Sequence, residues 1–152
     1  MTAMLDELRG AYIDEVSIGQ TAIFTKTITE TDIILFAGIS GDTNPVHLDQ
    51  DYAAGTRFKG RIAHGMLSAS LLSGVLGTKL PGPGCIYVAQ TLNFRAPVRP
   101  GDTVVARATV LSVDATRRLV VLETLCSVGD TMVLDGEATV QLPKRPRENP
   151  AA

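Results

Sequence analysis

The sequence predicts an α+β fold in which helices come first and strands follow. Two observations carry this prediction. Residues 64–80 are apolar or small on every face, with no charge between Met66 and Leu76, which is typical of a buried helix. Residues 85–142 alternate apolar and polar side chains in long runs, which is typical of antiparallel strands with one covered face.

The first elements are a strand and a helix that lead into a turn. Residues 20–28 form a β-branched run that suits a strand. Thr29 and Asp32 have the spacing of a capping box, although Asp stands in place of Glu, so we expect a helix from there to about Gly41. Residues 49–54 are expected to form a further helical turn.

The second half consists of one long helix and four strands. The run of Pro and Gly at 81–84 breaks the helix. The strands that follow are expected at 85–94, 102–113, 119–128 and 132–142. The side chains expected to face the core in the last three strands are Val104, Ala106, Ala108, Val110, Val120, Leu122, Thr124, Cys126, Leu134, Ala138, Val140 and Leu142.

Composition excludes several classes of protein. With 152 residues, 45% of them hydrophobic, the chain suits one folded domain. We expect that domain at 19–142, between a leader at 1–18 and a flexible tail at 143–152. The net charge of −2 comes from interspersed signs, so we expect no nucleic-acid partner. The segment 62–76 is too short to cross a bilayer, which takes about 20 apolar residues, so no membrane partner is expected.

The cysteines and the N-terminus predict a location. Cys85 and Cys126 are isolated and have no metal-ligand spacing, so we expect free, reduced and buried thiols. The first residues contain neither a basic start nor a long apolar run, which argues against a secretory signal. A cytoplasmic protein is therefore expected.

The chemistry is concentrated in the stretch 36–49, where Asp42, Asn44 and His47 surround Pro45. Proline restricts Asn44 to extended or turn geometry, so Asp42 and His47 are expected on a bent loop where they could hold one water between them. The alternative is an Asx turn after a helix, with Asp42 as a cap and His47 exposed. The residues alone leave both interpretations open.

Three blocks in order resemble one known family. Ser40-Gly-Asp-Thr-Asn-Pro-Val-His-Leu-Asp49 resembles the signature of the MaoC-like (R)-specific enoyl-CoA hydratases. Residues 62–77 are similar to the central helix of that family, and residues 80–87 to the segment after it. The resemblance runs from about Gly19 to Leu142, and three ordered blocks are far more specific than one short motif.

The resemblance implies a hot-dog fold, in which an antiparallel sheet wraps around a long central helix. It also implies a hydro-lyase of fatty acid metabolism that adds water reversibly to trans-2-enoyl-CoA and gives the (R)-3-hydroxyacyl-CoA. In that reaction Asp42 would be the general base, His47 would share the water, and the Gly65 N–H would bind the thioester oxygen. An acyl-CoA substrate is implied, with no metal and no organic cofactor. A homodimer that pairs the uncharged edge at 85–94 is implied as well.

Four assignments keep a second interpretation. Asn44 would fix either the loop or the water, and His64 would contact substrate or make a structural hydrogen bond. Gly65 would bind the substrate, or simply let the chain turn into the helix. Ser73 would bind the ligand, or satisfy a carbonyl of the preceding helical turn.

Alternative functions are also left open. A hot-dog acyl-CoA thioesterase would share the fold and the ligand. A dehydratase acting on acyl carrier protein thioesters would share the chemistry, and an acyl-binding module would have neither activity.

Overall fold

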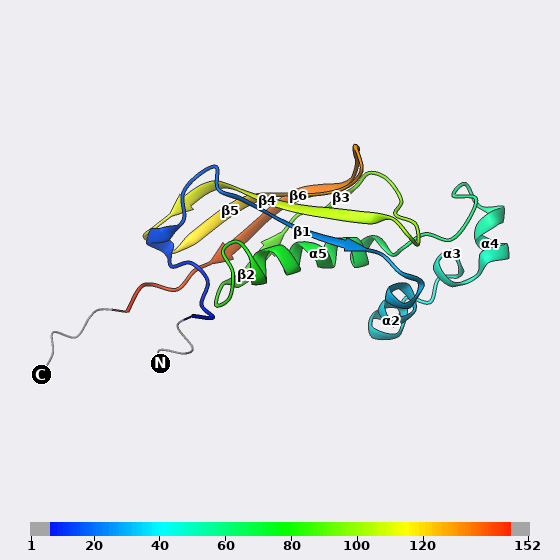
Figure 1. Cartoon of the computed structure of the whole chain (residues 1–152), viewed down its shortest axis with the longest axis horizontal. Helices are drawn as coiled ribbons and strands as arrows, with labels where there is room; N and C mark the ends of the chain where they lie inside the picture. The colour runs from blue at the N-terminus through cyan, green and yellow to red at the C-terminus, as the bar shows by residue number, and fades with distance from the viewer. Residues whose placement is uncertain (1–6, 147–152) are drawn as a thin grey trace, which may run out of the picture.

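A computed structural model describes residues 7–146 of the chain and confirms the α+β class. Figure 1 shows α5 running along one face of the sheet, with α2, α3 and α4 gathered beyond the end where α5 begins. The elements are η1 (Ile13–Glu15), β1 (Thr21–Thr27), α2 (Glu30–Ser40), α3 (Pro45–Leu48), α4 (Gln50–Gly55), α5 (Gly65–Thr78), β2 (Ile86–Gln90), β3 (Asn93–Phe94), β4 (Thr103–Asp114), β5 (Leu119–Val128) and β6 (Thr131–Gln141).

The sheet is antiparallel and lies against one long helix. Its strand order is β1-β4-β5-β6-β2, and β3 also pairs with β6. All the inward positions expected in β4, β5 and β6 are buried, as are Leu72, Val75 and Leu76 of α5. Because α5 contacts β1, β4 and β5, its apolar surface and the inner face of the sheet form one core. This arrangement is the hot-dog architecture.

The helix α2 ends immediately before the stretch that carries the chemistry. Its capping box is confirmed: the Asp32 N–H donates to the Thr29 hydroxyl at 3.1 Å, and the Thr29 N–H donates to the Asp32 carboxylate at 2.8 Å. The Thr29 hydroxyl also donates to the Asp32 carboxylate at 2.7 Å, and this bond, followed by the one from the Thr29 N–H, lowers the pKa of Asp32. At the other end Gly41 has a φ of 76° and donates its N–H to Ala37. The packed helix therefore fixes the direction in which the chain enters Asp42.

The prediction of one strand at 85–94 is wrong, because the chain forms two strands there. A bulge between Tyr87 and Ala89 shifts the register of β2, and the chain leaves the sheet before β3 begins. The carbonyl oxygen of Thr91 lies only 1.8 Å from the place where a Cβ on Gly136 would stand. This close approach requires a glycine at position 136 of β6. The sequence of 85–94 by itself therefore gives no sign that the strand is interrupted.

The stretch 42–47 is not a loop throughout. Pro45–Leu48 form the helical turn α3, with Pro45 at its first position, where no N–H is needed. The Asn44 side chain caps this turn by accepting the Val46 N–H at 3.2 Å. His47 is therefore carried by a short helix, and Asp42 by the connection in front of it.

Both ends of the described chain are tied together. Ile13 and Val16 belong to the core, and the Ile13 N–H donates to the Pro143 carbonyl at 3.2 Å. Arg145 donates to Asp14 at 3.1 Å and to Glu15 at 2.5 Å. The division at 19 and 142 stays a prediction, and residues 1–6 and 147–152 of the leader and tail lie outside the described residues.

Both cysteines are free, as expected. Cys126 is buried and Cys85 is half-buried, and burial raises the pKa of both thiols. Among the described residues, no helix is long and apolar enough to span a membrane.

Candidate active site

His47 is buried and held by a backbone carbonyl. Its Nδ1 lies 2.8 Å from the carbonyl oxygen of Ile62, and only 8% of the residue is exposed. A carbonyl can only accept a hydrogen bond, so Nδ1 carries the proton. In the neutral ring Nε2 is therefore an acceptor, and it faces Asp42.

Asp42 presents one free carboxylate oxygen to this nitrogen. Its Oδ1 accepts the N–H of Asn44 at 3.2 Å, and its own N–H donates to the Ser40 hydroxyl at 3.2 Å. The other oxygen, Oδ2, lies 3.9 Å from Nε2 of His47, and the side chain is 52% exposed. That separation is too long for a direct hydrogen bond, but one water bonded to both atoms can span it. The structure thus brings together the acid and the imidazole predicted from the sequence.

Gly65 is the first residue of α5, so its N–H has no acceptor one turn earlier in the helix. A Cβ at this position would lie 2.8 Å from Cε1 of the Phe94 ring. The φ of Gly65 lies outside the left-handed region, so entry into the helix does not require glycine. The missing side chain instead makes room for this ring, and the Gly65 N–H, at the positive end of the helix dipole, belongs to a residue that lines a cavity.

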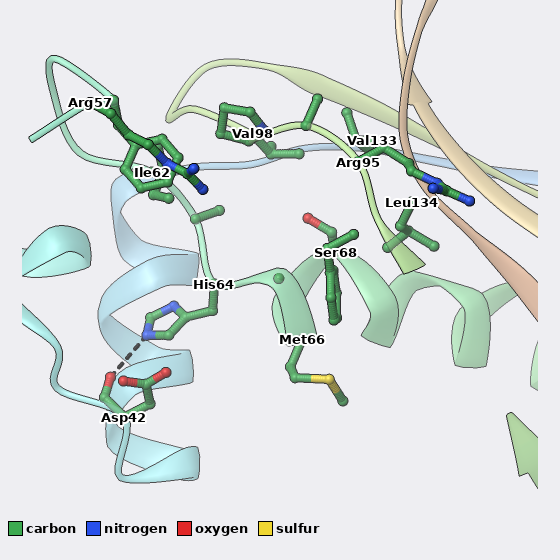
Figure 2. A pocket seen from close by; sticks show the side chains of 16 residues that line it. Asp42, Arg57, Ile62, His64, Met66, Ser68, Arg95, Val98, Val133 and Leu134 are labelled. Carbon is green, nitrogen blue, oxygen red and sulfur yellow. Dashed lines mark hydrogen bonds between the residues drawn. The ribbon is translucent and has the colours of Figure 1, made fainter. Parts of the chain in front are cut away.

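His64 makes the structural hydrogen bond that one of its two interpretations requires. Its Nε2 lies 2.9 Å from the backbone carbonyl oxygen of Asp42, drawn as the dashed line in Figure 2. Its ring stacks on that of His47, with the two ring centroids 3.8 Å apart. The ring of Phe36 packs against it at 5.0 Å.

A cavity of about 380 Å³ reaches Asp42, His64 and Gly65, whereas the buried His47 does not line it. Asp42, His64 and Gly65 line it together with Arg57 and Arg95. In Figure 2, Arg57 lies beside Ile62 at one end of the cavity, and Met66 extends from the first turn of α5. Arg95 is paired with Asp135 at 2.7 Å, whereas within residues 7–146 no carboxylate pairs with Arg57. The cavity therefore has a carboxylate on one wall and cationic groups on another.

A second cavity, of about 410 Å³, carries no charged side chain on its walls. Met66 lines both cavities, and Ser73 lines only the second. Desolvation raises the pKa of Tyr87 in its wall to about 12, so this phenol stays neutral and donates to the Gln90 amide oxygen. The amide nitrogen of Gln90 reaches the buried Thr124 hydroxyl at 2.9 Å.

Ser73 does not satisfy a helix carbonyl, which was one of its two predicted roles. The hydroxyls of Ser70 and Thr78 on the same helix do so, at 2.6 Å and 2.7 Å. Among the described residues no hydrogen bond to the Ser73 hydroxyl is present, and it faces the uncharged cavity. Asn44, in contrast, lines neither cavity and fixes the turn through its bond to Val46.

Asp42, His47 and His64 place three possible metal-ligand atoms within 4.8 Å of one another. Each imidazole already uses one nitrogen on a backbone carbonyl, which leaves Nε2 of His47 and Nδ1 of His64. The two rings are stacked with planes only 29° apart, so their in-plane lone pairs do not converge on one point. The residues fit a metal poorly, and the expectation of no metal stays a prediction.

Two features of the site were not predicted from the sequence. The carbonyl of Ile62, which sets the tautomer of His47, is a backbone group and leaves no signal in residue type. Phe94, whose ring covers the backbone of Gly65, sits in the segment predicted as a regular edge strand. In the sequence, the glycine at the start of the expected helix was the signal of such a contact.

Comparisons with known proteins place the chain among relatives of one family. Residues 15–130 match the family described as the MaoC like domain. The chain is 54% identical over 140 residues to an (R)-specific enoyl-CoA hydratase of Rhodospirillum rubrum, covering 92% of this chain and 97% of the relative. It is 51% identical to a 3-hydroxybutyryl-CoA dehydratase of Methylorubrum extorquens, covering 98% and 95%.

Solved structures show the same likeness. The (R)-hydratase of Aeromonas caviae has a TM-score of 0.82 at 42% identity, covering 84% of this chain and 98% of that one. An unliganded (R)-hydratase of Pseudomonas aeruginosa has a TM-score of 0.84 at 43% identity, covering 94% and 96%.

Proposed function

The chain belongs to the MaoC-like domain family, and from this premise we propose that Asp42, His47 and Gly65 are its reactive groups. It is an (R)-specific enoyl-CoA hydratase, a hydro-lyase that reversibly adds water to a trans-2-enoyl-CoA and gives the (R)-3-hydroxyacyl-CoA. The observation that carries the assignment of residues is the 3.9 Å between Asp42 Oδ2 and His47 Nε2, the gap that one water fills.

In this mechanism the bound water donates one hydrogen bond to Asp42 and one to His47, because Oδ2 and Nε2 are both acceptors. The oxygen of the water, left with its lone pairs toward the substrate, bonds to C3 while one O–H bond breaks. Asp42 takes that proton, and the pair returns it to C2. The atoms balance with water and enoyl thioester alone, so the chemistry calls for no cofactor.

Charge moves onto the thioester oxygen as the C3–O bond forms. The Gly65 N–H, at the N-terminus of the 14-residue helix α5, stabilises that charge where it develops. Its place in the same cavity as Asp42 supports this role. The missing side chain lets the oxygen approach the backbone.

The two cavities match the two ends of the substrate. The uncharged cavity with Ser73 would receive the acyl chain, and the cationic wall with Arg57 would face the phosphates of coenzyme A. Met66 would lie between them, since it lines both. Asn44 would act through the turn that it caps, and the proposed direct contact between His64 and substrate stays a prediction.

We also propose that the chain is a homodimer paired along β2. Ile86 and Val88 of β2 are 61% and 55% exposed, Phe94 of the following strand β3 is 54% exposed, and the segment 86–94 carries no charge. A second copy would complete the hydrogen bonds of the edge and cover these side chains. A cytoplasmic location stays a prediction.

The test of the function is an assay with a series of enoyl-CoA thioesters of increasing length. Hydration removes the enoyl absorbance without releasing thiol, and a chiral assay should find the (R) product. Release of free thiol would instead identify a thioesterase. The same acyl groups attached to acyl carrier protein test the alternative of a dehydratase for that carrier. Such an enzyme would hydrate them faster than it hydrates the coenzyme A thioesters.

A further inference from the structure

We propose that His64 is a positioning residue for Asp42 and His47, and that its Nε2–H group carries this role. The inference rests on the proposed function and deepens it. His64 is only 2% exposed, yet it touches both members of the pair. It donates to the backbone of Asp42 at 2.9 Å and stacks on the ring of His47 at 3.8 Å.

The hydrogen bond to Asp42 restrains a connection that is otherwise held locally. Asp42 lies between α2 and α3, and its other hydrogen bonds join it to Ser40 and Asn44, two residues away in each direction. The bond from His64 crosses 22 positions of sequence and fixes the same backbone to the start of α5. This bond therefore fixes the position of the carboxylate relative to α5. In the proposed mechanism the first N–H of that helix, on Gly65, binds the thioester oxygen.

The stacking contact restrains the other member of the pair. The edge of the His47 ring is anchored through Nδ1 to Ile62, and His64 covers its face. His64 is in turn backed by Phe36 of α2. An edge contact and a face contact together fix both the position and the plane of the imidazole, and with them the direction of Nε2.

The second nitrogen of His64 supports this role over direct substrate binding. Nδ1 is buried, and among the described residues it has no hydrogen-bond partner. A buried acceptor without a partner destabilises the fold, so the ring is not explained by stability alone. Because Nε2 is occupied and Nδ1 is inaccessible, neither nitrogen offers the substrate a free polar group.

Three substitutions at His64 test the contributions of Nε2, of Nδ1 and of the ring separately. In His64→Gln the amide nitrogen can reach the place of Nε2 and donate to Asp42. In His64→Asn the amide lies near the place of Nδ1 and cannot reach that carbonyl. His64→Phe keeps a ring against His47 but has no donor.

We expect His64→Asn and His64→Phe to lower kcat on the order of 100-fold at nearly unchanged KM, because a misplaced reactive group costs about that factor. His64→Gln should recover most of this loss. Unchanged kcat in His64→Asn would overturn the proposal. So would a raised KM alone, which indicates substrate binding, or a Gln variant as slow as the Phe variant.

A measurement on the unmodified protein covers the case in which these variants fail to fold. The chain has only two histidines, so ¹⁵N NMR resolves both imidazoles, and His47→Gln assigns them. We expect the Nε2–H tautomer for His64 and the Nδ1–H tautomer for His47, and an Nδ1–H tautomer for His64 would overturn the proposal. A wild-type chain that released thiol would refute the proposed function instead, so the two failures are distinguishable.

Discussion

Substitution of Gly65 by alanine tests whether the backbone at the start of α5 meets the substrate. The new Cβ would lie 2.8 Å and 2.9 Å from two atoms of the Phe94 ring, so the ring must retreat by about 0.6 Å to restore the 3.4 Å of an ordinary contact. Phe94 is 54% exposed on a two-residue strand and can make this shift. The methyl group and the displaced ring would then occupy the space through which the thioester oxygen approaches in the proposed mechanism.

The expected loss is large in activity and small in stability. A misplacement approaching 1 Å costs about 100-fold in rate, or about 2.7 kcal/mol of transition-state stabilisation. Alanine needs no unusual φ at this position and is a better helix former than glycine by about 0.5–1 kcal/mol, which offsets the steric strain. We therefore expect kcat/KM for enoyl-CoA hydration to fall about 100-fold, with a melting temperature within a few degrees of the wild type.

Gly77→Ala is the matched control on the same helix. Nothing lies within 4 Å of the Cβ it would add, and Gly77 lines neither cavity. The control should keep full activity and gain about 0.5–1 kcal/mol of stability. Near-wild-type kcat/KM in Gly65→Ala would refute the close approach of substrate to this N–H. Equal losses of activity and of melting temperature would show that glycine is needed for folding.

Hydrogen bonds from Arg9 and then the Tyr12 N–H lower the pKa of Glu15 from 4.5 to about 2, so its stabilisation is complete above pH 4.5 and disappears toward pH 2. The free energy of unfolding of Glu15→Gln should thus fall below that of the wild type at pH 7 and converge with it in acid; a difference independent of pH would contradict this. Gly136→Ala should unfold or strongly destabilise the protein in thermal denaturation, since its Cβ would lie 1.8 Å from the Thr91 carbonyl oxygen. Sedimentation at micromolar concentration should find a dimer, and a fully active monomer would refute pairing along β2.

The parts of the fold set by local sequence were predictable. The capping box of Thr29 and Asp32 depends on residues three apart, and the alternation along β4 to β6 depends on neighbouring residues only. The division of the 85–94 segment was not predictable, because it depends on Gly136 of another strand. A single sequence does not show which glycine will meet which carbonyl.

The site divides in the same way. The stiff turn around Pro45 allowed Asp42 and His47 to hold one water, with an Asx turn and an exposed His47 as the alternative, and the structure places their polar atoms 3.9 Å apart with His47 buried. The bonds that orient the pair come from the carbonyl of Ile62 and the ring of His64, which fold back from the next segment. Such contacts are tertiary, so neither spacing nor residue type reveals them.

A double-mutant cycle on Asp42 and His47 tests most directly whether the two groups activate one water together. Initial hydration rates are measured for Asp42→Asn, His47→Gln and the double variant, with circular dichroism to verify the fold. Each single change should cost about 10²- to 10⁴-fold, and the double variant should be no slower than the slower single one, because the residues act as a unit. Near-full turnover in either single variant, or losses that multiply in the double variant, would contradict a shared water.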